Sequence, residues 1–313
     1  MGLDKHVHTL GTYMKQRYGS KIHKLTIDAA FTCPNRDGSL GLGGCTFCNV
    51  SSFSAEHGSK ASVAEQLAAG KQRRGGKEKR YMAYFQAYTS TYDEYAVLKD
   101  KYQQAMDVSD IVGLCVGTRP DCVPDDVLAL LVSYQQQGME VWLELGLQTA
   151  HASTLKKINR GHDFEAYRDT VTRARALGIK VCTHLILGLP GETPAHAEQT
   201  LQLVLDAGVD GIKLHPLHVV ENSTMAKQWR ADRLPLWTLE KYVATACDLI
   251  RQTPAEVVFH RVSAYARPPE LLAPDWCGDK WLAMNAIVDN LAQLGGQASA
   301  VGSQRIEVTA SSV

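Results

Sequence analysis

Residues 33–48 read CPNRDGSLGLGGCTFC and contain three cysteines, Cys33, Cys45 and Cys48, with eleven and two residues between them. Clustered thiolates are soft ligands and are typical of zinc or iron–sulfur sites. A structural zinc site needs four ligands, and the next cysteine after this motif is Cys115. Three thiolates can hold a four-iron cluster and leave one iron open to a second cofactor. The spacing therefore favours such a cluster, and the alternatives are an incomplete zinc site or a reduced loop without metal.

The glycines of the same stretch favour a loop that wraps closely around a bound group. They are Gly38, Gly41, Gly43 and Gly44. Glycine tolerates positive φ and lets the backbone approach closely, and its amide N–H can donate to a cluster sulfur. Phe47 lies between the paired cysteines, where its ring could cover one side of the site.

The composition is that of an ordinary globular protein. The chain has 313 residues, of which 45% are hydrophobic and 21% charged, and its formal net charge is +0. This length can bury a sizeable core, and a neutral chain has no overall field that attracts a polyanion. The eight cysteines come without an apolar signal segment near Met1, which favours a reducing compartment. We therefore expect a cytoplasmic protein with no membrane partner.

Short apolar runs alternate with helical patterns, which predicts repeated βα units and a parallel sheet. The expected strands cover residues 22–30, 81–86, 111–116, 141–147, 179–187, 211–215 and 257–261. At least six repeats of this kind fit a partial or full α/β barrel. We expect one domain over residues 1–295, with a basic N-terminal segment. Residues 296–313, rich in small and polar residues, are expected to form a loosely ordered tail.

Polar groups follow the expected strands where barrel enzymes keep their functional residues. The cysteine loop follows the first strand. The groups after the next five strands are residues 86–89, 118–121, 148–149, 188–191 and 215–218. Because the carboxyl ends of parallel strands meet at one edge of the sheet, we expect these groups to converge.

The cysteine motif, which ends in Cys-Thr-Phe-Cys, resembles that of the radical S-adenosylmethionine (SAM) superfamily. Its long first spacing is similar to the branch that contains the catalytic subunit of Elongator, and the chain resembles the bacterial YhcC and YtqA type more closely still. The resemblance rests on residues 33–38 (CPNRDG), 84–91 (YFQAYTST), 117–122 (GTRPDC) and 142–151 (WLELGLQTAH). It extends over nearly the whole chain and implies a partial (βα)6-type radical SAM barrel, with the cluster loop after the first strand.

The same resemblance implies two cofactors. A [4Fe–4S] cluster would be held by Cys33, Cys45 and Cys48, and SAM would bind the fourth iron. A flavodoxin- or ferredoxin-type protein would supply the electron that cleaves SAM to methionine and a 5′-deoxyadenosyl radical. That radical would then take a hydrogen atom from a substrate.

The resemblance also assigns residues to SAM. It places Gln148 on the ribose, Arg160 on the carboxylate and Phe47 near the adenine, with Leu187 lining the adenine through backbone groups. Many relatives carry a Gly-Gly-Glu-like turn after the second strand, whose backbone receives the SAM amino group. This chain has Phe-Gln-Ala-Tyr there, so Gln86 or a backbone carbonyl would take that role.

Other polar residues near the expected barrel mouth are candidates for contact with the substrate, and a structural role is the alternative for each of them. They are Tyr88, Tyr92, Arg119, Asp121, Glu144, Lys213, His215, His218, His260 and Arg261. The remaining cysteines show no paired spacing and are interpreted as buried or incidental thiols. They are Cys115, Cys122, Cys182, Cys247 and Cys277.

Three functions are consistent with these features. The first is a radical SAM enzyme that acts on a wobble-uridine side chain of tRNA, as in the Elongator-like branch, with the basic segments 1–24 and 71–80 contacting RNA. The second is a radical SAM enzyme that acts on a small molecule, similar to the oxygen-independent coproporphyrinogen oxidases. The third is an iron–sulfur binding or sensing protein without catalysis, which would leave Gln148 and Arg160 unexplained.

Overall fold

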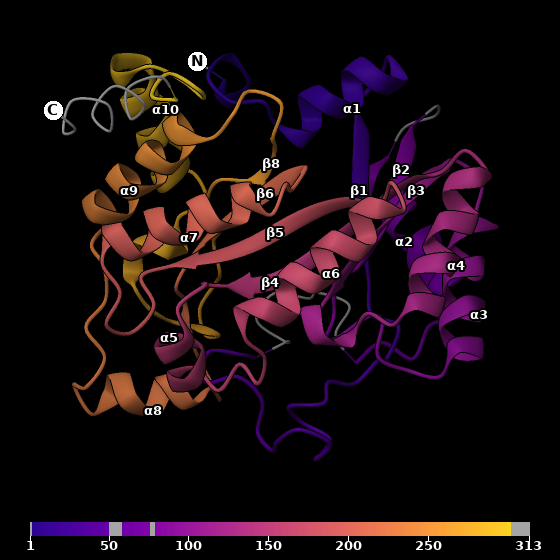
Figure 1. Ribbon diagram of the computed structural model, residues 1–313, viewed down its shortest axis with the longest axis horizontal. Coiled ribbons are helices and arrows are strands. Elements are labelled where there is room, and N and C mark those ends of the chain that lie inside the picture. Colours follow the sequence, from indigo (N-terminus) through magenta and orange to yellow (C-terminus); the bar gives the residue numbers. More distant parts are fainter. Residues whose placement is uncertain (1, 50–57, 76–78, 302–313) are drawn as a thin grey trace, which may run out of the picture.

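Parallel strands form a single curved sheet that determines where every functional residue lies. The structure is a computed structural model that describes residues 2–49, 58–75 and 79–301. Within these residues the strand order is β1-β2-β3-β4-β5-β6-β8, with every neighbouring pair parallel. The strands are β1 (Ile22–Ile27), β2 (Arg80–Phe85), β3 (Ile111–Thr118), β4 (Glu140–Gln148), β5 (Lys180–Leu187), β6 (Gly211–Pro216) and β8 (Val258–Arg261). The sheet curls into an open half-barrel, so the predicted partial barrel is confirmed (Figure 1).

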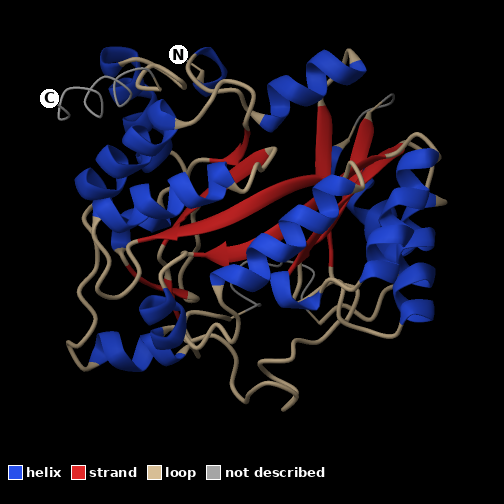
Figure 2. Cartoon of the chain, viewed as in Figure 1, coloured by secondary structure: helices blue, strands red, loops and turns tan. Residues whose placement is uncertain are grey.

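Helices cover the convex face of the sheet, as Figure 2 shows in blue. The helices are α1 (Leu10–Tyr18), α2 (Val63–Arg74), α3 (Tyr95–Met106), α4 (Asp125–Gln136), α5 (Ala152–Lys157), α6 (Phe164–Ala176), α7 (Pro194–Asp206), α8 (Thr224–Arg230), α9 (Leu239–Gln252) and α10 (Leu282–Leu294). A short antiparallel pair, β7 (Val219–Val220) and β9 (Leu271–Ala273), lies outside the main sheet. The sequence analysis located the strands within a few residues but missed α3, α5, α8 and α10.

Side chains alternate along each strand between the helical layer and the barrel interior. On β5, Val181 and Leu185 pack in the large outer core, whereas Cys182 and His184 point inward. The amino end of the interior is filled by a separate apolar cluster that includes Met82 and Trp142. The carboxyl end stays open and carries the polar residues, which is the arrangement expected of a barrel enzyme.

The N-terminal helix α1 closes the amino end of the half-barrel and is not simply a solvated surface helix. Met14 is 1% exposed and packs in the inner apolar cluster. Tyr13 donates a hydrogen bond at 2.9 Å to Glu140, the first residue of β4. The amide of Phe259 on the edge strand β8 donates to the carbonyl of His8 at 2.8 Å.

The start of the expected tail is anchored to the domain. Gln297 accepts a hydrogen bond from the His8 amide at 2.8 Å and donates to the carbonyls of Pro254 and Val257 at 2.6 and 2.8 Å. Residues 296–301 are thus connected to the domain, because the side-chain amide of Gln297 satisfies backbone groups of two separate segments. Residues 302–313 lie outside the described part of the chain. No helix of the described residues is both long and apolar enough to span a membrane.

A buried carboxylate joins five strands inside the half-barrel. Glu144 on β4 has a fully buried side chain and contacts Lys24 on β1, His184 on β5, Lys213 on β6 and His260 on β8. The distances from its oxygens are 2.7 Å to His184 Nε2, 3.0 Å to His260 Nδ1 and 3.2 Å to Lys213 Nζ. Each partner donates a hydrogen bond or supplies a positive charge to the carboxylate, and together they offset the free-energy cost of burying it.

We predict that Glu144→Gln lowers the free energy of unfolding by about 3 kcal/mol, since it leaves the buried lysines without their counter-charge. Urea denaturation followed by circular dichroism measures this. Glu165→Gln, which removes an exposed ion pair to Arg168, is the control and is expected to change stability by less than about 1 kcal/mol. An equally small effect of Glu144→Gln would show that the buried cluster does not stabilise the fold.

Candidate active site

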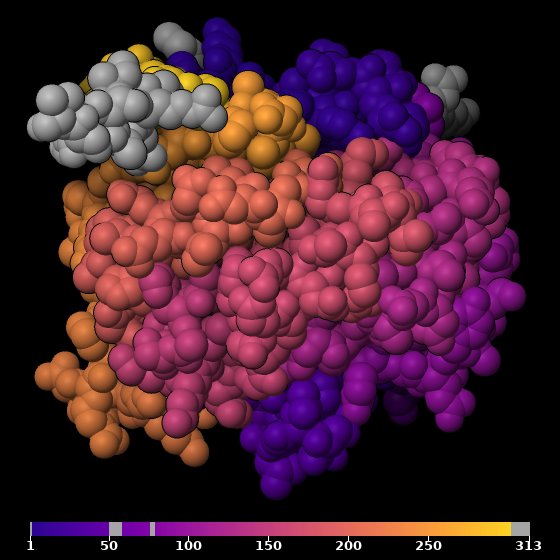
Figure 3. Space-filling view, viewed as in Figure 1, coloured from indigo at the N-terminus to yellow at the C-terminus, as the bar shows by residue number. Residues whose placement is uncertain are grey.

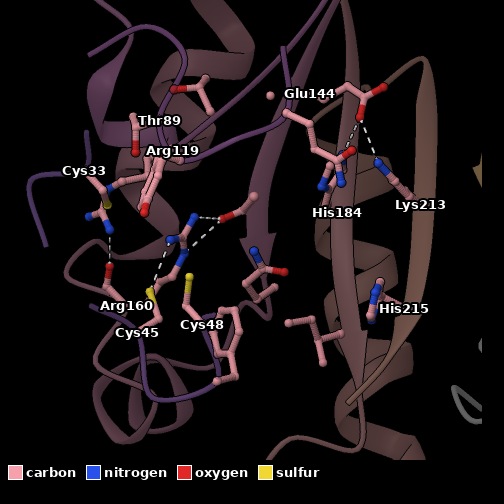
Figure 4. A pocket seen from close by; sticks show the side chains of 18 of the residues that line it. Cys33, Cys45, Cys48, Thr89, Arg119, Glu144, Arg160, His184, Lys213 and His215 are labelled. Carbon is pink, nitrogen blue, oxygen red and sulfur yellow. Dashed lines mark hydrogen bonds and ion pairs between the residues drawn. The ribbon is translucent and has the colours of Figure 1, made fainter. Parts of the chain in front are cut away.

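A pocket of about 220 Å³ opens at the carboxyl end of the strands and gathers most of the predicted site residues. Its walls include all three motif cysteines and the four other residues Phe47, Gln86, Gln148 and Arg160. Figure 4 shows two opposite sides: Cys33, Cys45, Cys48 and Arg160 on one, and Glu144, His184, Lys213 and His215 on the other. We call these the cysteine wall and the Glu144 wall. Four of the five predicted strand-end groups therefore reach the pocket together with the cysteine loop, whereas no residue of 188–191 lines it.

Asn35 and Arg119 hold the cysteine loop against the turn that follows α5. The Asn35 amide donates to the carbonyls of Asn159 and Arg160 at 2.6 and 3.1 Å. Arg119 donates to the Arg160 carbonyl at 2.7 Å and is itself fixed by two hydrogen bonds to Asp121. Arg119 was a candidate for contact with the substrate, with a structural role as the alternative, whereas the role of Asn35 was not predicted. The loop tip, with exposed Leu40 and Leu42, projects from the lower edge of the molecule (Figure 3).

Arg160 is buried and lies beside a cysteine sulfur. Its Nη1 donates to Cys45 Sγ at 3.4 Å, and its Nε donates to the Gly146 carbonyl at 3.1 Å. Gly146 is required here, because a Cβ at this position would lie 2.8 Å from both Arg160 Nη2 and Gln148 Nε2. A missing side chain on β4 thus makes room for the two polar residues predicted to bind SAM.

The donor chemistry of the cysteine wall fits an iron–sulfur cluster. The three cysteines are free thiols that line one pocket, and the side chains of Arg160 and Asn35 both donate toward Cys45 Sγ, at 3.4 and 3.6 Å. Such donors adjust the potential of a cluster. Among the described residues, no three cysteine, histidine or carboxylate side chains lie close enough together to hold a single metal ion. A cluster that offers a separate iron to each cysteine does not need them to converge on one point.

Leu187 is not among the residues that line the pocket, and the role expected for its backbone groups toward the adenine stays a prediction. Its side chain packs in the outer core, and its carbonyl accepts a hydrogen bond from the Leu217 amide at 2.9 Å. The preceding residue, Ile186, lines the pocket instead. Strict alternation along β5 from the inward-facing His184 would have identified Ile186.

Most of the candidate substrate residues lie in the pocket wall, and three of them do not. Tyr88, Arg119, Glu144, Lys213, His215, His218 and Arg261 line the pocket. Tyr92 bonds to Ser39 at the loop surface, Asp121 supports Arg119, and His260 lies behind Glu144. Of the cysteines outside the motif, Cys115, Cys182, Cys247 and Cys277 are buried, whereas Cys122 is partly exposed.

Contacts between Glu144 and its partners keep this carboxyl group ionised. Burial alone would raise the pKa of Glu144, but Lys213, Lys24 and the two histidines outweigh burial and hold that pKa well below its usual value. Burial lowers the pKa of His184 to about 4, with repulsion from Lys213 as the next cause. His184 is therefore neutral near pH 7, and its Nε2–H donates to the carboxylate.

The described residues of the two basic segments lie toward the opposite end of the barrel from the pocket, apart from Lys24, which contacts Glu144. Residues 71–75 and Lys79 precede the amino end of β2, whereas the cysteine loop follows the carboxyl end of β1. Lys71 is paired with Asp110 at 2.9 Å, and Arg80 donates to the Tyr18 carbonyl. Lys77 lies outside the described residues. The closed end of the barrel separates Lys71, Lys79 and Arg80 from the pocket.

Comparisons with known proteins agree with this geometry. The family model described as the radical SAM superfamily matches residues 33–204, and the model of the radical SAM C-terminal domain matches residues 209–293. The chain belongs to the radical SAM superfamily. It is 57% identical over 302 residues to protein YhcC of Escherichia coli K12, a match that covers 96% of this chain and 97% of that protein. The predicted YhcC-type relationship is confirmed.

More distant matches show the fold and a partial sequence similarity. The solved structure of Elp3 from the archaeon Methanocaldococcus infernus has a TM-score of 0.62 at 15% identity, and the match covers 88% of this chain but 63% of that one. The tRNA uridine(34) acetyltransferase of Dehalococcoides mccartyi is 27% identical over 154 residues, or 48% of this chain and 33% of that protein. This chain therefore spans under two thirds of the length of both proteins.

We predict that Cys33→Ala, Cys45→Ala and Cys48→Ala each abolish the binding of about four iron and four sulfide per chain in anaerobically purified protein. Cys115→Ala and Cys277→Ala are the controls, since these buried thiols lie outside the cysteine wall, and they are expected to keep the iron. Iron and acid-labile sulfide analysis measures the content. Zinc without iron in protein produced under iron-replete, anaerobic conditions would contradict the assignment.

Proposed function

We propose that this protein is a radical SAM enzyme that abstracts a hydrogen atom from a small organic substrate in the pocket between the cysteine wall and the Glu144 wall. The observation that supports it most is that Cys33, Cys45, Cys48, Gln148 and Arg160 line one pocket, although they come from three separate segments. A cluster bound by the cysteines would supply the electron that splits SAM into methionine and the 5′-deoxyadenosyl radical. A flavodoxin- or ferredoxin-type reductant belongs to the same proposal.

The residues of the chain have five tasks in this proposal. The cysteines hold the cluster, and Phe47 packs with the apolar residues around Leu217 to form one side of the pocket. Gln148 binds the ribose, because an amide can both donate to and accept from hydroxyl groups. Arg160 binds the carboxylate of SAM through donors not used by Gly146 and Cys45. The apolar cluster below Glu144 excludes water from the amino end of the barrel.

We predict that the reduced protein cleaves SAM slowly to 5′-deoxyadenosine and methionine without added substrate. Arg160→Ala should weaken SAM binding by about 1.5–3 kcal/mol, which is the loss of a charge-assisted hydrogen bond, or roughly ten- to a hundredfold in Kd. Isothermal titration with SAM and chromatography of the products measure both effects.

The matched control is Arg168→Ala, which removes an exposed arginine of α6 paired with Glu165. Iron content is measured on each variant, because Arg160 also contacts Cys45. Unchanged affinity and cleavage in iron-loaded Arg160→Ala would remove that residue from the site. Iron-loaded wild-type protein that neither binds nor cleaves SAM would favour a non-catalytic iron–sulfur protein.

A wobble-uridine side chain of tRNA is the second candidate substrate. It is supported by the partial similarity to an enzyme whose name places it on tRNA uridine 34. The position of the basic segments at the closed end of the barrel favours the small-molecule alternative, since a phosphate backbone needs cationic residues beside the open end.

We predict that tRNA from a strain that lacks the gene carries an unchanged set of modified nucleosides. Mass spectrometry of the hydrolysed tRNA measures this, and gel-shift titration at physiological salt is expected to show no binding. The loss of one modified nucleoside, restored by the wild-type gene but not by the Cys45→Ala variant, would instead establish the tRNA candidate.

A further inference from the structure

Two cations lie side by side on the Glu144 wall of the pocket. Lys213 on β6 and Arg261 on β8 are partners in the register of the two strands, and both side chains line the pocket. Like charges at directly opposite positions of neighbouring strands are destabilising unless something compensates them. Lys213 is 6% exposed, so water does little to screen its charge.

The protein itself supplies little compensation for these charges. Among the described residues that line the pocket, Glu144 is the one carboxylate, and it already contacts Lys24 as well as Lys213. Arg261 forms no ion pair with any described carboxylate. Two other arginines of the pocket have protein partners of their own. Arg119 pairs with Asp121, and Arg160 donates hydrogen bonds to the Gly146 carbonyl and to Cys45 Sγ. The Glu144 wall therefore carries more positive than negative charge.

The pKa and the hydrogen bonds of Lys213 agree with a site that lacks enough negative charge. The pKa of Lys213 is lowered to about 8: burial is the largest cause, Glu144 opposes it, and Arg261 and Lys24 add to the lowering. The lysine donates to the Tyr84 hydroxyl at 2.7 Å and to Glu144 at 3.2 Å, which leaves one of its three donors without a described partner. His215 and His218 on the same wall add no charge, because burial lowers the pKa of each of them.

We propose that Lys213 and Arg261 bind an oxyanion, a carboxylate or a phosphate, carried by the small substrate. This inference rests on the proposed function and names the class of its substrate. A guanidinium can bind either group through two parallel hydrogen bonds, and the ammonium of Lys213 adds a point charge at the bottom of the pocket. The anion would neutralise the surplus charge that the two strands hold together. The cysteine wall would then receive SAM, and the Glu144 wall would orient the substrate.

The test uses anaerobic, cluster-loaded protein with SAM and two probe anions, malonate and inorganic phosphate, against chloride at equal ionic strength. We expect at least one probe to raise Tm in a saturable manner, because a ligand that binds the native state stabilises it. Malonate alone would indicate a carboxylate substrate and phosphate alone a phosphate ester; a response to both supports the shared oxyanion site. Arg261→Gln should weaken the response at least tenfold in probe concentration, while Arg261→Lys keeps part of it.

Arg267→Gln is the matched control, since Arg267 is an exposed arginine close to β8 that does not line the pocket, and it should respond as the wild type does. A lack of stabilisation by both probes, or an equal response in Arg261→Gln, would overturn the inference. So would a tenfold loss of SAM affinity in iron-loaded Arg261→Gln, because the wall would then belong to SAM. Wild-type protein that holds no cluster or binds no SAM refutes the proposed function instead, so the two failures are distinguishable.

Discussion

The carboxylate of Glu144 is the contact on which the barrel interior depends. The described sheet is open, since β1 and β8 are not paired with each other. Lys24 from β1 and His260 from β8 nevertheless both reach Glu144. Side chains thus connect the two edges where backbone hydrogen bonds do not. Burying a carboxylate costs free energy unless every partner is in place. A shift of one strand relative to another would remove a partner of Glu144 and so destabilise the fold. The register of five strands is therefore coupled through a single residue.

The same residue sets the character of the pocket above it. The apolar cluster around Met82 and Trp142 fills the interior below Glu144, and Gly146 leaves space above it. The floor of the pocket is consequently polar and cationic, whereas its sides at Phe47 and Ile186 are apolar. A substrate in such a pocket meets charge at its deep end and apolar contacts along its length. This combination supports a small amphipathic molecule more than a nucleic acid backbone.

Local signals in the sequence were sufficient for the strands and for the cysteine wall. Cys33, Cys45 and Cys48 lie within sixteen consecutive residues, 33–48. An apolar run identifies a buried strand without knowledge of which strands pair with it. The Glu144 wall depends on contacts between residues far apart in the sequence, such as Lys24 and Glu144, which are 120 positions apart. No local pattern indicates that Lys24 points inward while the other charges of its segment face solvent. The place of Ile186 in the pocket wall has a different origin, because it follows from strand alternation once one inward residue of β5 is known.

The two walls of the pocket also differ in where they lie along the chain. All the residues of the cysteine wall fall within residues 33–204, the part that matches the superfamily model. Lys213 and Arg261 fall within residues 209–293, the part that matches the C-terminal model. Chemistry that a superfamily shares is expected to reside in its common part, whereas substrate choice depends on groups that differ between members. The strands β6 and β8 continue the same sheet, so substitutions at Lys213 and Arg261 change the charge of the Glu144 wall. The C-terminal part also contacts the cysteine loop, since the Met225 amide donates to the Thr46 carbonyl at 2.9 Å and Phe47 packs with the cluster around Leu217. This division lets one barrel keep its cofactor site and vary the molecule on which it acts.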